Sequence, residues 1–126
     1  MRTRIAAVAA VAALVAAGTA MGIASAATAV HPKLFGTVGI NDAFKITLKT
    51  AKGKKVTTLK AGTYTLVVND KSSIHNFHIK GPGLNKVVTT VPFVGTKSVL
   101  VTLTKGVYTY VCDPHFTTMH GKIVVA

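Results

Sequence analysis

The sequence Gly106–Gly121, GVYTYVCDPHFTTMHG, contains the end of a strand and the loop that follows it. Tyr108, Tyr110 and Cys112 occupy every second position, so in a strand their side chains lie on one face. Pro114 has no N–H to donate to a neighbouring strand and therefore ends the strand just after the cysteine. We expect the Cys112 thiol to lie at the end of a strand and to point inward.

The chain before this stretch alternates in the same way and contains no amphipathic segment of helix length. Glycine and proline interrupt it at short intervals, as turns require. In one segment, residues 43–50, Phe44, Ile46 and Leu48 share a face. We expect an all-β fold of about eight strands in a two-sheet sandwich or a barrel. The segments that fit strands are 34–38, 43–50, 56–59, 63–69, 74–80, 86–91, 97–104, 107–112 and 122–125.

The composition is that of a folded, basic protein. Of the 126 residues, 49% are apolar and only 14% are charged, which excludes a disordered chain and suits one modest domain. Lysine and arginine number 15 against 3 acidic residues, for a net charge of +12. A single cysteine cannot form an intramolecular disulfide, so Cys112 is either a buried, inert residue or one retained for its chemistry.

The N-terminus has the features of an export signal. Two arginines precede an Ala/Val-rich apolar run over residues 5–17, and Ala24-Ser25-Ala26 offers a small-residue cleavage site. We expect residues 1–26 to be removed and residues 27–126 to form one domain. An uncleaved anchor is the alternative, because no charged residue lies between Ile5 and Val30.

Four side chains predict a metal site. Cys112, His115 and Met119 lie within eight residues, and a histidine from Ser73–Ile79 can join them. Alternation there places His75 and Phe77 on one face and His78 on the other, so one histidine faces the interior. A thiolate, two imidazoles and a thioether are the donors of a mononuclear electron-transfer copper site, because the sulfur donors suit Cu(I) and imidazole suits both oxidation states.

These residues resemble the cupredoxin family, specifically the small blue copper proteins of the plastocyanin and amicyanin type. The resemblance covers roughly residues 62–125 and depends on the order Cys112, Pro114, His115, Met119 with His75-Asn76 upstream. It implies an eight-stranded Greek-key sandwich that binds one type 1 copper.

The resemblance also implies a role for each residue of the motif. Cys112, His75 and His115 would be equatorial ligands and Met119 the axial one. Asn76 and Pro114 would support the ligands. Asn76 would hold the two ligand segments together and form a hydrogen bond near the sulfur.

Two features depart from the plastocyanin pattern. Three residues separate His115 from Met119, where plastocyanins usually have four and amicyanins two, and this chain is basic where plant plastocyanins are generally acidic. The exposure of the histidine, the potential and the partner therefore do not carry over.

Other readings of single residues remain open. Cys112 alone would be a small buried hydrophobe, and Met119 could be a core residue. His78 could replace His75 as the ligand, although alternation and the following Asn76 favour His75 and leave His78 facing solvent. His31 and His120 are expected to be exposed histidines.

The lysines are spread along the chain, without a run or interleaved aromatic residues. We expect attraction to an acidic docking surface on a redox partner, or to an anionic membrane or wall surface, weakened by salt. Nucleic acid is not expected, because no binding motif is present. We expect a monomer that is exported to the periplasm or the cell envelope, or outside the cell.

The first functional hypothesis is an exported carrier of single electrons that cycles between Cu(I) and Cu(II). The second is copper sequestration or delivery without redox turnover, which could use the same ligands. Enzyme activity is not expected. Val111 and Asp113 flank the cysteine instead of the histidines of multicopper oxidases, and no oriented base identifies a thiol hydrolase. A metal-free adhesion module would leave the ligand spacing as a coincidence.

Overall fold

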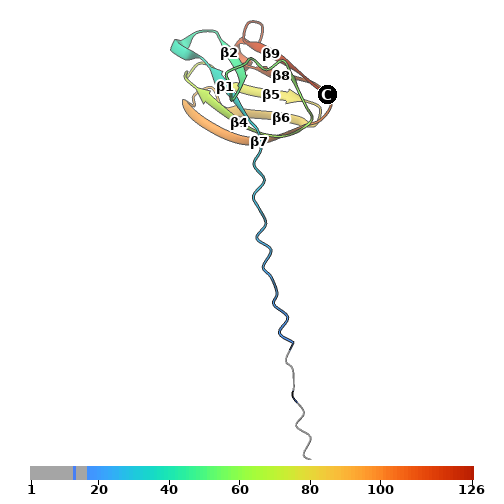
Figure 1. The fold of residues 1–126 in the computed structure, drawn as a ribbon. Coiled ribbons are helices and arrows are strands. Elements are labelled where there is room, and N and C mark those ends of the chain that lie inside the picture. The colour runs from blue at the N-terminus through green and yellow to red at the C-terminus, as the bar shows by residue number, and fades with distance from the viewer. Residues whose placement is uncertain (1–12, 14–16) are drawn as a thin grey trace, which may run out of the picture.

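The computed structural model describes residue 13 and residues 17–126, and its folded part begins at Lys33 (Figure 1). The described part of the chain contains nine strands and two short 3₁₀ turns, η1 (Ile40–Asp42) and η2 (Asp113–His115). The strands are β1 (Lys33–Val38), β2 (Ile46–Thr50), β3 (Thr58–Leu59), β4 (Gly62–Asp70), β5 (Phe77–Gly81), β6 (Leu84–Thr89), β7 (Gly95–Leu103), β8 (Gly106–Val111) and β9 (His120–Val125).

The strands form two sheets, of order β2-β1-β4-β7 and β3-β9-β8-β5-β6, packed face to face. Neighbours are antiparallel except for the pairs β1–β4 and β3–β9. The predicted all-β sandwich is therefore confirmed, with nine strands where about eight were expected.

The register gives the sandwich two ends. Val38, Asp70 and Val111 end their strands on the same side, which we call the His75 end because the β4–β5 loop carries that residue. The opposite side, the Lys33 end, carries the start of β1, the β2–β4 connection, the β5–β6 and β7–β8 turns and the C-terminus. Residues 17–32 leave the Lys33 end as an extended, largely exposed segment (Figure 1).

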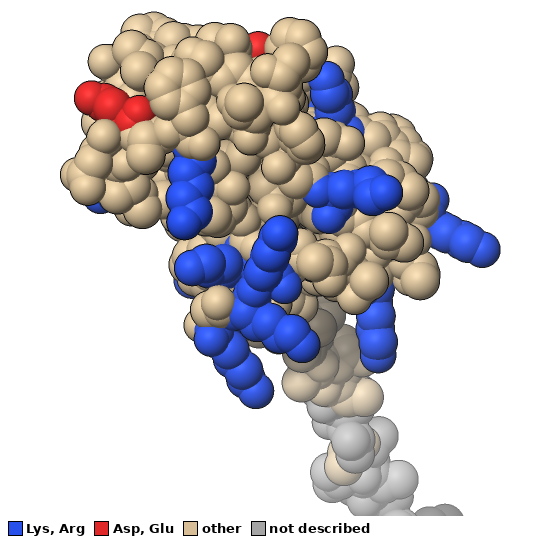
Figure 2. All heavy atoms as spheres, turned by 90° about the horizontal axis from the view of Figure 1, so that it is seen from above, with Lys and Arg blue, Asp and Glu red and all other residues tan. Residues whose placement is uncertain are grey.

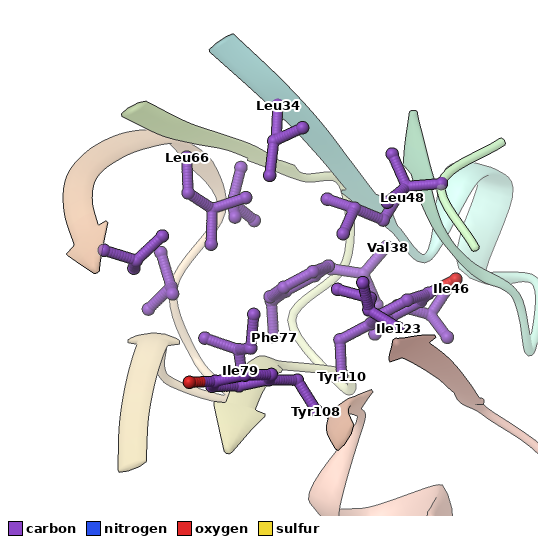
Figure 3. Packing of buried hydrophobic residues seen from close by; sticks show 14 of the residues in the cluster. Leu34, Val38, Ile46, Leu48, Leu66, Phe77, Ile79, Tyr108, Tyr110 and Ile123 are labelled. Atoms are coloured by element: carbon purple, nitrogen blue, oxygen red, sulfur yellow. The ribbon is translucent and has the colours of Figure 1, made fainter. Parts of the chain in front are cut away.

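The inward faces of both sheets meet in one apolar core (Figure 3). Tyr108, Tyr110 and Cys112 are all buried, as their alternation predicted. Phe77 from β5 stacks on Tyr110 from β8, with ring centroids 5.8 Å apart and planes 3° from parallel. Phe77 is two residues after His75, and Tyr110 is two residues before Cys112. The core therefore extends to the segments that carry His75 and Cys112.

Three predicted strands begin later than expected, and one of them is the segment 56–59, which becomes a strand only at Thr58. The segment 43–50 becomes a strand only at Ile46, because Asn41 and Asp42 have positive φ angles of 54° and 58° and turn the chain outward. Phe44 was expected to share a face with Ile46 and Leu48, which are buried, but it is 59% exposed. The segment 74–80 becomes a strand only at Phe77, so His75 lies in a loop.

The predicted export signal, residues 1–26, lies partly outside the described residues, and its cleavage stays a prediction. No helix among residues 13 and 17–126 is long and apolar enough to cross a membrane.

We predict that Tyr108→Phe destabilises the fold by about 1–2 kcal/mol. The Tyr108 hydroxyl donates to the carbonyl of Pro82 at 2.8 Å and accepts from the N–H of Thr104 at 3.0 Å, so it joins two turns of the Lys33 end. Urea unfolding followed by circular dichroism measures the loss. Tyr64→Phe is the matched control, because it removes a hydroxyl whose single bond, to the carbonyl of Lys60, is exposed to water. Equal losses in the two variants would contradict the prediction.

Candidate metal centre

Three side chains from separate segments meet at the His75 end. His75 lies in the β4–β5 loop, Cys112 directly follows β8, and His115 ends η2. The His75 Nδ1 and His115 Nδ1 atoms are 3.0 Å apart, and Cys112 Sγ lies 3.6 and 3.7 Å from them. This is the one group of three or more His, Cys, Asp or Glu donors that could hold a metal within the described residues.

The spacing of these donors fits a metal ion. With metal–sulfur and metal–nitrogen bonds of about 2.3 and 2.0 Å, as at zinc, donors arranged trigonally around an ion lie roughly 3.5–3.8 Å apart. The two sulfur–nitrogen distances, 3.6 and 3.7 Å, lie in this range, while the two Nδ1 atoms are closer, at 3.0 Å, which a smaller angle at the ion accommodates. Two imidazoles and a thiolate are also the equatorial donors of blue copper sites. The residues present therefore fit copper in both geometry and chemistry.

The His75 ring is held by the loop that follows β1. Its Nε2–H donates to the carbonyl of Asp42 at 3.2 Å, which leaves Nδ1 as the unprotonated atom facing the cluster. Only glycine fits at position 39, next to the His75 ring. Its φ is +70°, and a Cβ there would lie 2.5 Å from Cβ of Ser72 and 2.8 Å from Cδ2 of His75.

Asp42 fixes the same loop through its side chain as well. Its carboxylate accepts a hydrogen bond from the Ser72 hydroxyl at 2.6 Å, and the Ser72 N–H donates to Asp70 at 3.1 Å. The β1–β2 and β4–β5 loops are therefore bonded to each other on the far side of the His75 ring. Sequence reasoning missed these contacts, although Gly39-Ile40-Asn41-Asp42 has the composition of a turn.

Cys112 is completely buried. Burial raises the pKa of its thiol, the N–H groups of Asn76 and His115 lower it, and the carboxylates of Asp113 and Asp70 raise it further. The thiol therefore carries its proton in the metal-free protein. Because a metal binds the thiolate, metal binding must release this proton and weakens as the pH falls.

Backbone hydrogen bonds close the loop from Cys112 to Met119. The Cys112 N–H donates to the carbonyl of Met119 at 3.0 Å, while the N–H groups of Thr118 and Met119 both donate to the carbonyl of His115, at 3.1 and 2.9 Å. The Met119 side chain is 1% exposed and belongs to the core cluster. The loop therefore holds His115 and Met119 in fixed positions relative to the cysteine.

Asn76 joins the two segments that carry the donors. Its Nδ2 donates to the Asp113 carboxylate at 2.8 Å, and its Oδ1 accepts from the Asp113 N–H at 2.7 Å. His78 bonds the same carboxylate through Nδ1 at 2.9 Å. Its Nε2 bonds to Asn85.

Asp113 is therefore the centre of a small polar network behind the cluster. Partial burial raises its pKa, but the hydrogen bonds of Asn76 and His78 and the nearby charges of His78 and Lys80 outweigh this effect, and the pKa is lower than the ordinary 3.8.

One aromatic residue covers the cluster from outside. The Phe44 ring contacts the rings of His75 and His115 edge-on, with centroid distances of 5.2 and 4.5 Å. Phe44 is more than half exposed and His115 is partly exposed. The cluster therefore lies just below the surface, separated from solvent by a few side chains.

A comparison of the sequence with protein-family models gives a match over residues 38–126 to the family described as copper binding proteins, plastocyanin/azurin family. The chain belongs to this family. It is thus a cupredoxin, as the motif indicated, and copper is its cofactor. No curated protein matches the sequence significantly.

Solved structures of cupredoxins are similar to this one. Reduced rusticyanin, studied by NMR, is 25% identical, with 75% of this chain and 76% of that chain covered and a TM-score of 0.49. Rusticyanin from Thiobacillus ferrooxidans gives 24% identity, the same coverage and 0.46. A chain of a heme-copper terminal oxidase dimer gives 20% identity, coverage of 75% and 63%, and 0.50, a likeness of fold alone.

The cupredoxin structure places each predicted site residue. It brings His75, Cys112 and His115 together, with Met119 buried in the same loop and Pro114 exposed within η2. His78 lies on the opposite face of β5 from Ile79, as alternation predicted, but its side chain is only 13% exposed because it bonds Asp113. His120 bonds the carbonyl of Phe116, and His31 lies at the Lys33 end, so neither joins the cluster.

We predict that Asp113→Asn destabilises the metal-free cupredoxin in a pH-dependent way. Because folding lowers the pKa of Asp113, its ionised carboxylate stabilises the fold above pH 3.8, and this contribution disappears as the pH falls through the lowered pKa. The side chain is 45% exposed, so we expect a loss of only about 0.5–1 kcal/mol at neutral pH. Urea unfolding of both proteins should show the difference at pH 7 and a progressively smaller one as the pH falls below 3.8. A difference that does not change with pH would contradict the prediction.

Proposed function

We propose that the protein is an exported carrier of single electrons whose copper is held by His75, Cys112, His115 and Met119. The observation that carries this proposal is the convergence of the two Nδ1 atoms and Sγ, all within 4.8 Å of one another, at one end of the sandwich. Asn76 and Pro114 support these ligands from the adjoining positions. When bound, copper supplies a one-electron couple between Cu(II) and Cu(I).

The residues around the donors favour a site that changes little during redox cycling. The His75 Nε2–H is bonded to the Asp42 carbonyl, the loop of Cys112 is closed onto Met119, and Asn76 joins both segments. Such hydrogen bonds fix the orientation of ligands and keep a donor set ready for either oxidation state. Fast electron exchange requires that the ligands move little between the two oxidation states. Delivery of copper to an acceptor requires ligands that release the metal.

Electrons would pass through the His75 end. His115 is the partly exposed ligand, and Phe44 packs against its ring. Exposed apolar side chains lie in loops at the same end, which suits a small and transient contact with a redox partner. They are Ile40, Phe44, Ile74, Val94 and Phe116, between 46% and 65% exposed.

The charges near this surface are mixed. Lys45 and Lys71 lie at the same end as Asp42 and Asp113. We propose that apolar contact brings redox partners to His115. Most of the lysines lie at the Lys33 end. An acidic docking surface on a partner, as expected from the net charge, would therefore contact that end.

Other parts of the proposal depend on the sequence. Residues 1–26 would direct export to the periplasm or the cell envelope, and the domain would act as a monomer. We propose no catalysis, because the described residues provide one mononuclear donor cluster and no second metal group. Copper sequestration or delivery is the alternative, since it could use the same ligands.

We predict that the full chain, after addition of Cu(II), shows an intense blue thiolate-to-copper absorption band. The band should be absent in Cys112→Ser, because serine provides no thiolate. Ascorbate should bleach it and an oxidant should restore it over repeated cycles, with the copper retained in the presence of a Cu(I) chelator. A band that fails to appear would refute the copper ligation, whereas loss of copper to the chelator on reduction would identify a delivery protein.

We predict that Met119→Leu keeps the blue band and raises the reduction potential. Loss of a donor destabilises the more highly charged Cu(II) more than Cu(I), so the couple shifts toward the reduced form. A tenfold change in this preference corresponds to about 59 mV for one electron. Cyclic voltammetry of the wild type and the variant measures the shift. An unchanged potential would show that Met119 is a core residue and not an axial ligand.

A further inference from the structure

The charges of the described domain are separated along the strands. All three acidic residues, Asp42, Asp70 and Asp113, lie at the His75 end. Seven exposed lysines lie at the Lys33 end, where no acidic residue is found. Figure 2 shows lysines gathered near the point where the N-terminal segment leaves the domain, with the acidic side chains at the opposite edge. The seven are Lys33, Lys49, Lys52, Lys54, Lys55, Lys60 and Lys105.

A shallow, mainly apolar groove lies among these lysines. Its lining includes Leu34, Leu59 and Tyr64 from the sandwich, together with Lys33 and Lys52. Lysine can lay its stem along an apolar surface while its ammonium group reaches outward. The Lys33 end therefore combines an apolar floor with a cationic rim, which suits an interface between water and lipid.

We propose that the Lys33 end binds the surface of an anionic phospholipid bilayer. The seven lysines come from five separate segments: the start of β1, the end of β2, the β2–β3 connection, the β3–β4 turn and the β7–β8 turn. A bilayer presents a continuous layer of phosphate groups. Lysines on separate segments can therefore all pair with phosphates at once, although the bilayer has no surface shaped to fit them. An acidic protein would need carboxylates placed to match each of them.

The course of the chain supports this partner. The N–H of Thr65 donates to the carbonyl of Pro32 at 2.9 Å, so the N-terminal segment leaves the fold at the same end as the lysines. The apolar run over residues 5–17 lies upstream of it. The sixteen residues 17–32 can span at most about 55 Å when extended. Whenever the apolar run is in a bilayer, the Lys33 end is thus kept near its surface.

Binding in this orientation points the His75 end away from the lipid. That consequence rests on the proposed function, because only the copper site makes the orientation useful, while the lipid contact itself needs no copper. A protein attached in this way would meet its redox partners with His115 outward.

The test is sedimentation of the full chain with vesicles of phosphatidylcholine alone or mixed with phosphatidylglycerol. The triple variant Lys52→Gln/Lys54→Gln/Lys55→Gln removes charge from the Lys33 end. The control Lys71→Gln/Lys86→Gln/Lys122→Gln removes the same charge from exposed positions elsewhere. Circular dichroism of both variants checks that they fold.

We expect the first variant to lose about tenfold or more in affinity for the anionic vesicles, and the control much less. Binding of the wild type should weaken as salt rises. Equal losses in both variants would show an effect of net charge only, and equal binding to neutral vesicles would show insertion of the apolar run only. Discrimination between the variants on polyglutamate but not on vesicles would identify an acidic polymer or protein as the partner. Each of these three results overturns the proposal. Because sedimentation does not depend on copper, its failure is distinct from failure of the redox function.

Discussion

Two hydrogen bonds between Asn76 and Asp113 determine how the copper donors meet. The donors come from segments 37 residues apart, and Asn76 and Asp113 are the neighbours of His75 and Cys112 in those segments. They help to keep the Nδ1 atom of His75, which lies in a loop, at 3.6 Å from Sγ of Cys112. Because the amide of Asn76 both donates and accepts, it fixes the distance and the relative orientation of the two segments. His78 then holds the carboxylate that Asn76 uses.

Packing in the core of the sandwich also restricts the two segments that Asn76 and Asp113 join. β5 and β8 are neighbours in the five-stranded sheet, and the residues next along these strands, Phe77 and Tyr110, stack in the core. A movement of His75 away from Cys112 would have to open this stack as well as the polar network. The site is therefore an extension of close packing, in which displacement of one side chain requires displacement of several.

Features that depend on neighbouring residues were predictable, and features that depend on pairing across the fold were not. Alternation around Cys112 and the stop at Pro114 are local, so the burial of Tyr108 and Tyr110 and the loop with His115 followed from the sequence. Phe44 was misplaced because the left-handed turn at Asn41 and Asp42 breaks the alternation that put it on one face with Ile46 and Leu48. The bond from His78 to Asp113 needs the β5–β8 register, which no local pattern specifies.

The length of the strands explains how one small domain can carry a basic surface and a mixed one without conflict. A six-residue strand such as β1 or β8 spans about 20 Å, and the ends of the sandwich are separated by at least this distance. Exposed charges are largely screened beyond about 8 Å at physiological salt. The lysines of the Lys33 end therefore add little to the field at His115, where the apolar side chains decide which surfaces can approach. If the two proposals hold, a change in lysine content at the Lys33 end would alter where the protein is held without altering the proposed contact for electron exchange.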